Sequence, residues 1–128
     1  MPSLNPKRGD IYWVLVPAHH TVGTEQQKRR PWIIFSDEAI VTQRLVIAVP
    51  LSQKVHKQNR QFRILVTQAN ILHDPGSTLM PGDRIALTEQ IRALSIDRLE
   101  PSRQGRLTDT AFYAVEAGVA FVLAMPTG

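Results

Sequence analysis

Short apolar stretches alternate with polar, turn-rich stretches along most of this chain, a pattern typical of β-strands joined by loops. The apolar stretches are rich in β-branched and aromatic residues, which suit a pleated, half-buried surface. The predicted strands are Asp10–Val16, Trp32–Phe35, Leu45–Leu51, Phe62–Thr67 and Arg84–Leu87, with Glu100–Gly105 as a further candidate.

Two longer connections interrupt these strands. The first, Pro17–Lys28, contains Gly23 and predicts a loop. The second, Asn70–Asp83, contains the dipeptides Pro75-Gly76 and Pro81-Gly82, which favour tight turns because proline fixes φ and glycine tolerates positive φ. Neither connection has the period of a helix.

The C-terminal segment predicts one amphipathic helix. Thr108 can cap its N-terminus, and Asp109 then lies in the first turn, where the helix dipole favours a negative charge. Apolar residues follow at spacings of three and four, namely Phe112, Val115, Val119 and Val122. We expect this apolar side to pack on the sheet.

Several short strands followed by one helix indicate a mainly β (α+β) fold. Parallel strands need crossover helices, which the pattern lacks, so a small, strongly bent antiparallel sheet or β-barrel with a C-terminal α-helix is favoured. At 128 residues the chain is long enough to bury a core as one domain. We therefore expect a single domain over residues 1–128.

Composition removes several classes of protein. The absence of cysteine excludes disulfides, thiolate zinc sites and a cysteine nucleophile. The N-terminus is polar and has no apolar core of a signal peptide, and the apolar run Ala111–Met125 is interrupted by Glu116 and shorter than the ~20 residues of a membrane span. We expect a soluble, cytoplasmic protein with no membrane contact, no cofactor and no metal site.

Basic charge is concentrated in the first half of the chain. Residues 1–64 hold ten Lys and Arg against four Asp and Glu, whereas residues 65–128 hold five against seven. A clustered basic surface is the electrostatic footprint of a polyanion ligand, although charge alone fits simple solubility equally well.

The segment Thr21–Ser36 combines several chemically useful groups. Glu25 and Gln26 precede the basic cluster Lys28-Arg29-Arg30, which runs into a strand through Pro31. This order can place a carboxylate, an amide and a guanidinium around one loop beside a rigid sheet, where binding and catalytic residues are common.

Five short motifs occur in the order of the MazF/PemK toxins, and the chain resembles that family. The motifs are Arg8-Gly9-Asp10-Ile11-Tyr12-Trp13, Val22-Gly23-Thr24-Glu25-Gln26, Arg30-Pro31, Pro50-Leu51-Ser52 and Glu89-Gln90-Ile91-Arg92. The resemblance implies a small SH3-like barrel that forms a homodimer. It also implies a toxin that cuts single-stranded RNA at short sequences without a metal ion, and a cognate antitoxin protein that blocks the RNA groove.

The resemblance assigns three residues to catalysis. Metal-independent RNA cleavage requires deprotonation of the 2′-hydroxyl, protonation of the leaving oxygen and stabilisation of the phosphorane. Arg30 has paired donors that match phosphate oxygens, and Ser52, where relatives often carry threonine, can donate a hydroxyl hydrogen. Glu25 is either the general base or the carboxylate that orients Arg30; both roles remain open.

Further residues are predicted to contact RNA or to assist. The expected RNA contacts are Gln26, Lys28, Arg29, Lys54, His56, Lys57, Gln90 and Arg92, although solvated surface roles are comparably plausible for the basic ones. Some relatives carry a catalytic histidine at the place of Thr24, together with an arginine and an aspartate where Leu87 and Glu89 stand. That alternative site is mostly missing here, but His20 could substitute in space.

Two other functions compete with RNA cleavage. A barrel with a basic N-terminal half could bind single-stranded nucleic acid without cutting it. Alternatively, a toxin of the CcdB type shares the barrel but poisons DNA gyrase through its C-terminal end. The combination of Arg30 with Ser52 favours the nuclease over both.

Overall fold

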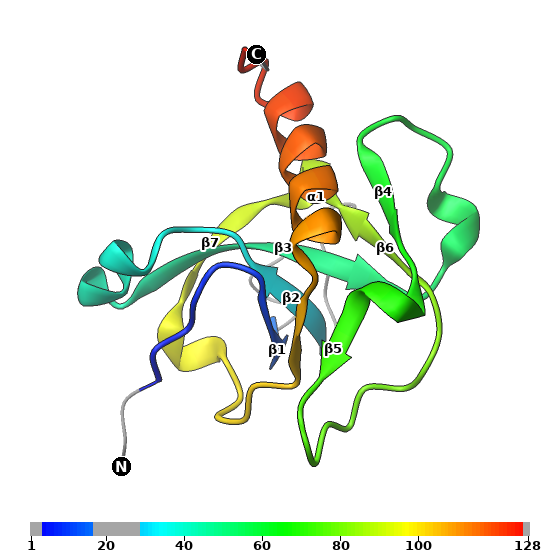
Figure 1. The fold of residues 1–128 in the computed structure, drawn as a ribbon. Coiled ribbons are helices and arrows are strands. Elements are labelled where there is room, and N and C mark those ends of the chain that lie inside the picture. Colours follow the sequence, from blue (N-terminus) through cyan, green and yellow to red (C-terminus); the bar gives the residue numbers. More distant parts are fainter. Residues whose placement is uncertain (1–3, 17–28, 127–128) are drawn as a thin grey trace.

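A computed structural model describes residues 4–16 and 29–126 of the chain. The described part contains eight strands and one α-helix (Figure 1). These are β1 (Asp10–Val14), β2 (Arg30–Ile34), β3 (Leu45–Ser52), β4 (Arg63–Val66), β5 (Ile71–His73), β6 (Arg84–Leu87), β7 (Arg92–Ser95), β8 (Gly105–Leu107) and α1 (Asp109–Val122). Short 3₁₀ helices join several of them: η2 (Glu38–Gln43), η3 (Val55–Lys57), η4 (Gln68–Asn70), η5 (Thr88–Gln90) and η6 (Ile96–Arg98).

All of the strands pair antiparallel, in the order β4-β6-β3-β2-β1-β8-β5, and β7 adds to the first half of β3. The sheet bends strongly along β3, which pairs successively with β7, β2 and β6. The result is a nearly closed β-barrel with a C-terminal helix, which confirms the predicted fold class.

Most predicted strands are confirmed, but four of the observed strands differ from the prediction. β2 begins at Arg30, because Pro31 fits into the ladder opposite Trp13. β5 lies inside the predicted turn region, where three residues suffice to pair with β8. β7 has no counterpart among the predicted strands, and β8 occupies Gly105–Leu107 rather than Glu100–Gly105.

The sheet has an apolar cluster on each face. One cluster joins residues such as Ile11, Ile33 and Leu51 to the buried side of α1. The other lies on the opposite face and includes Tyr12, Trp32, Ile34, Val46 and Leu94. Alternate residues of each strand therefore enter different clusters, as expected for a sheet buried on both faces.

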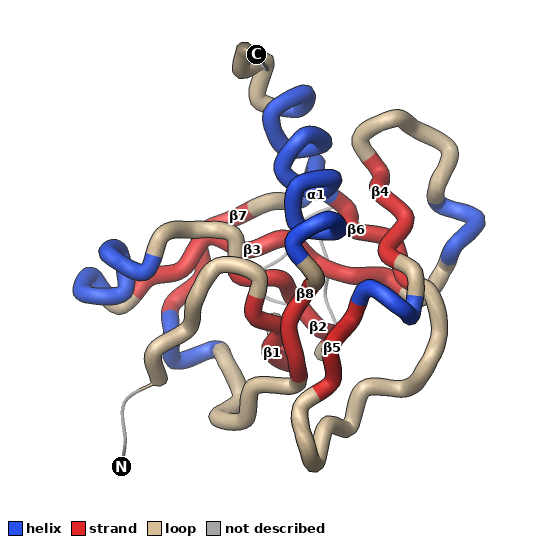
Figure 2. The backbone as a smooth tube through the Cα atoms, viewed as in Figure 1, coloured by secondary structure: helices blue, strands red, loops and turns tan. Residues whose placement is uncertain are grey.

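The predicted helix forms with the predicted cap. The Thr108 hydroxyl oxygen accepts a hydrogen bond from the Ala111 amide at 3.3 Å, and Asp109 lies in the first turn. Gly118 allows close contact with the sheet, since an added Cβ would lie 3.0 Å from side-chain atoms of Ile64 and Thr88. Figures 1 and 2 show the C-terminal end of α1 extending past the sheet. No described helix is both long and apolar enough to cross a bilayer.

Candidate active site

The register of β2 and β3 brings Arg30 and Ser52 level with each other. Trp32 pairs with Pro50 across the two strands. Arg30 precedes Trp32 by two residues, and Ser52 follows Pro50 by two residues. Because residues two apart on a strand share a face, as do paired residues of antiparallel strands, Arg30 and Ser52 project from the same face of the sheet.

The same face continues onto β6 and β4. Ser52 pairs with Ile85, and Ile85 pairs with Leu65 on the next strand. Two residues further along this register, Leu87 pairs with Arg63. The Arg63 side chain therefore projects from the face that carries Ser52.

β7 adds another guanidinium to this surface. Arg92 pairs with Ala48, which lies four residues before Ser52 on β3 and so shares its face. We call the surface that carries Arg30, Ser52, Arg63 and Arg92 the arginine face. Helix α1 packs on the opposite face, against residues such as Val49 and Leu51.

Arg30 is half-buried at the start of β2. Burial lowers the pKa of its guanidinium, which nevertheless stays charged near neutral pH. Its Nε is buried without a hydrogen-bond partner in the described part of the chain, and the same holds for Nε1 of Trp32, two residues along the strand. A desolvated cation with an unsatisfied donor is well suited to bind an anion.

Ser52 is 4% exposed at the end of β3. Its hydroxyl oxygen accepts a hydrogen bond from the Lys54 amide at 3.1 Å. That contact fixes the position of the oxygen and leaves the hydroxyl hydrogen available to donate. Ser52 thus provides a positioned neutral donor beside the Arg30 cation.

Arg63 forms a partly buried ion pair with Glu89 on the arginine face. Its Nε and Nη2 donate to Oε2 of Glu89 at 2.9 and 2.6 Å. Sequence reasoning did not include either residue among the site residues. Glu89 stood in the fifth sequence motif, whereas only the β4–β6 register, which sequence spacing does not reveal, could have indicated that Arg63 lies beside Ser52.

The structure places several predicted RNA contacts around these residues. Lys54 and His56 are exposed just after Ser52, and the backbone of Lys57 belongs to η3. Gln90 ends η5 and Arg92 begins β7; both are half-buried. Their roles in RNA binding stay predictions.

Arg29 is held away from the arginine face, by Trp13 and Glu100. Its guanidinium lies 4.0 Å from the ring centroid of Trp13 and donates to both carboxylate oxygens of Glu100 at 2.5 and 2.8 Å. The hydrogen bond to Glu100 raises the pKa of Arg29. Trp13 projects from the face opposite Arg30, so the structure separates these two adjacent arginines. RNA binding by Arg29 stays a prediction.

Five predicted site residues lie outside the described residues: His20, Thr24, Glu25, Gln26 and Lys28. The choice between base and orienting carboxylate for Glu25 therefore stays open. Within residues 4–16 and 29–126, no three histidine or acidic side chains gather into a metal-binding group.

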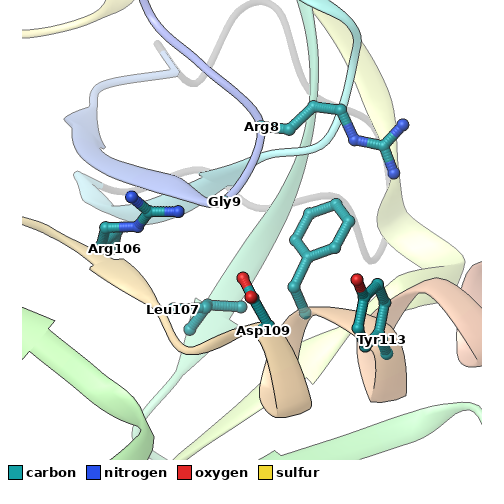
Figure 3. Close-up of a pocket in the computed structure, with 7 residues that line it drawn as sticks. Arg8, Gly9, Arg106, Leu107, Asp109 and Tyr113 are labelled. Atoms are coloured by element: carbon teal, nitrogen blue, oxygen red, sulfur yellow. The ribbon is translucent and has the colours of Figure 1, made fainter.

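A cavity of about 260 Å³ lies at the N-terminus of α1, on the helix side of the sheet (Figure 3). Arg8 and Arg106 line it, together with Asp109 and Tyr113 of the helix. Arg8 already donates to Glu116 at 2.9 Å. This cavity is separate from the arginine face.

Comparison with known proteins identifies the family. A family model of the PemK-like, MazF-like toxins of type II toxin–antitoxin systems matches residues 7–123. The chain belongs to this toxin family. The resemblance read from the five sequence motifs is thereby confirmed. No curated protein sequence is similar enough to this MazF/PemK-family toxin to count as a relative.

Solved structures share the fold of this MazF/PemK-family toxin. MazF from Deinococcus radiodurans superposes with a TM-score of 0.72 at 18% identity, over 96% of this chain and 100% of that one. An endoribonuclease from a mycobacterial species gives 0.67 at 20% identity, over 98% and 97%. A mycobacterial endoribonuclease in complex with its cognate antitoxin gives 0.58 at 21% identity, over 97% and 98%.

Proposed function

We propose that this toxin is a metal-independent endoribonuclease that cuts single-stranded mRNA at specific short sequences and so inhibits translation and growth. The observation that carries the proposal is the half-buried Arg30 guanidinium, whose Nε has no partner among the described residues, level with the buried Ser52 hydroxyl. Together they provide a charged and a neutral donor for one phosphate.

The reaction begins with attack of the ribose 2′-hydroxyl oxygen on the adjacent phosphorus. The hydroxyl proton passes to a base, the bond from phosphorus to the 5′-oxygen breaks, and that oxygen takes up a proton. The products are a 2′,3′-cyclic phosphate and a 5′-hydroxyl end. Because the nucleophile belongs to the substrate, the step needs no metal-activated water.

Arg30 and Ser52 would act on the charge that develops in this step. The guanidinium binds the non-bridging phosphate oxygens, and the Ser52 hydroxyl donates to one of them as negative charge accumulates. Glu25 would serve as the base or orient Arg30. Lys54, His56, Lys57, Gln90 and Arg92 would hold the flanking nucleotides, with Gln26 and Lys28 on the loop side.

The proposal includes two protein partners. The antitoxin complexes among the similar structures support a cognate antitoxin for this toxin. A homodimer is supported by apolar side chains at the C-terminal end of α1 and just beyond it, where Phe121, Leu123 and Met125 are more than half exposed. Since mRNA is the proposed substrate, the toxin would act in the cytoplasm.

Purified protein and a long unstructured RNA in excess EDTA test the proposal. We expect discrete fragments with cyclic-phosphate ends, nearly complete loss of cutting in Arg30→Ala, and normal cutting in Arg8→Ala, an arginine that pairs with Glu116 of α1 on the helix side. Intact RNA with the wild type, or equal cutting by Arg30→Ala, would contradict it. Salt-sensitive binding without products would instead indicate a non-catalytic binding barrel. Loss of gyrase supercoiling would indicate a gyrase-directed toxin.

A further inference from the structure

Glu89 has one oxygen that is engaged and one that is not. Oε2 accepts two hydrogen bonds from Arg63, at 2.9 and 2.6 Å. Arg63 is itself held by its Nη1, which donates to Oδ1 of Asn59 at 3.3 Å. Oε1 of Glu89 is buried and has no hydrogen-bond partner in the described part of the chain.

An unpaired buried carboxylate oxygen is unfavourable for the folded protein alone, because it has lost water and gained no donor. Such groups are rare in native proteins and call for a physical explanation. The Arg63 guanidinium fixes the orientation of Glu89, but both of its hydrogen bonds to this carboxylate go to Oε2. It therefore does not compensate for the burial of Oε1. A ligand that donates to Oε1 would remove the penalty.

The position of this carboxylate indicates what the ligand is. Arg63 and Ser52 both lie on the arginine face. Ser52 pairs with Ile85 of β6, Ile85 pairs with Leu65 of β4, and Arg63 lies two residues before Leu65. Glu89 belongs to η5, which leads directly into Arg92 and β7. An RNA strand whose phosphate lies at Arg30 and Ser52 would therefore extend a neighbouring base toward Glu89.

A carboxylate oxygen accepts hydrogen bonds and cannot donate them. It pairs well with the exocyclic amino group of cytosine, adenine or guanine, whereas uracil has no amino group, and a uracil keto oxygen at the same place would set acceptor against acceptor. Arg63 fixes the direction of the carboxylate through two hydrogen bonds, so that the selection depends on hydrogen-bond pattern.

We propose that Glu89, positioned by Arg63, is a specificity-determining residue that selects an amino-bearing base (cytosine, adenine or guanine) over uracil at one position of the RNA cleavage site. This inference rests on the proposed nuclease function and adds to it a residue that touches the substrate base. Arg63 is a positioning residue, because it acts through Glu89.

Glu89→Gln provides a sharp test. The side-chain oxygen of the glutamine will stay with the Arg63 donors, because the opposite orientation would place an NH₂ group against the guanidinium. The glutamine NH₂ group will therefore take the place of Oε1. Wild type and variant are incubated with a long RNA of diverse sequence, and the 5′-hydroxyl ends are mapped by sequencing. We expect the ratio of cutting at amino-bearing bases to cutting at uracil to fall by about tenfold or more at one position, with other positions unchanged.

Two further variants complete the experiment. Glu116→Gln is the matched control, since it breaks an Arg–Glu ion pair on the helix side and should leave the cutting pattern unchanged. Arg63→Lys provides a second test, independent of whether Glu89→Gln folds. It should weaken the preference at the same position, because a single ammonium holds the carboxylate less rigidly.

The outcomes separate this inference from the function on which it rests. If the wild type cuts RNA and both variants of the Arg63–Glu89 pair give the wild-type pattern, the inference is wrong and the nuclease function stands. If Glu116→Gln changes the pattern as Glu89→Gln does, the inference is also wrong. If the wild type does not cut RNA at all, both proposals fall.

Discussion

Arg103 donates its Nε and Nη2 to the two carboxylate oxygens of Asp74, at 2.7 and 2.9 Å. Its Nη1 also donates to Oδ1 of Asp10 at 3.2 Å, and Asp10 is 4% exposed. The hydrogen bond to Asp74 is the main cause of the raised pKa of Arg103. One guanidinium thus joins the first residue of β1 to the connection that follows β5.

Replacing this guanidinium should weaken the fold. In Arg103→Met, the buried Asp10 carboxylate loses a charged partner and keeps only the Lys7 amide among its described contacts. We expect the free energy of unfolding in urea to fall by about 1–3 kcal/mol. Arg106→Met, at an exposed site three residues later, should change it by less than about 0.5 kcal/mol. Equal stability of both variants would show that the contact to Asp10 is unimportant.

Ser52 should affect the rate of cleavage more than the binding of RNA. Ser52→Ala removes one donor to the developing phosphorane charge, so we expect kcat to fall by about a hundredfold with little change in KM. Ser52→Thr keeps the hydroxyl and should retain most of the activity. Steady-state rates on a short fluorescent RNA would check both. An unchanged kcat in Ser52→Ala would remove Ser52 from the catalytic site.

Gly118 should tolerate no larger side chain. Its Cβ position is already 3.0 Å from Ile64 and Thr88, so Gly118→Leu must push α1 away from the sheet. We expect a loss of about 1–3 kcal/mol in thermal or urea unfolding. Ala114→Leu, at an exposed position of the same helix, is the control and should be nearly neutral. Comparable loss in both would indicate that leucine itself, rather than packing, disturbs the helix.

The Arg29–Glu100 pair should make a small, pH-dependent contribution to stability. The hydrogen bond from Arg29 lowers the pKa of Glu100 below its ordinary 4.5. A carboxyl with a lowered pKa stabilises the fold above its unfolded-state pKa, and this stabilisation is lost as pH falls through the lowered value. Because both side chains are largely exposed, the effect should be below about 1 kcal/mol.

Comparison of the wild type with Glu100→Gln would detect this contribution. The difference in unfolding free energy between them should be largest near pH 6–7 and should shrink toward zero under acidic conditions, well below the ordinary pKa of a glutamate. A difference that stayed constant across this range would assign the effect to packing instead.

Sequence patterns predicted the strands that carry their own apolar signal, such as β1 and β6, and the capped helix α1. They did not predict β7, whose four residues, RALS, hold only one long apolar side chain and become a strand through pairing with β3. Such strands depend on tertiary partners, which a local pattern does not contain.

The candidate site likewise combines residues that sequence motifs predicted with residues that only the structure places there. Arg30 and Ser52 could be selected from their motifs, and the β2–β3 register places them together. Sequence motifs assigned catalysis to Arg30 and only an RNA contact to Arg29, but they could not show that Arg29 pairs with Glu100, more than seventy positions away. Nor could it place Arg63 beside Ser52, since their proximity arises through β6.

The three-way pairing of β3 has a consequence for the timing of toxicity during synthesis. Ser52 is fixed against Ile85, and the first half of β3 is fixed against β7, so the end of β3 is complete only after residues 84–95 have been made. Pairing of such distant segments is slow compared with local folding. We therefore expect the nascent polypeptide to be harmless to the messenger and ribosome that produce it until its last third has emerged.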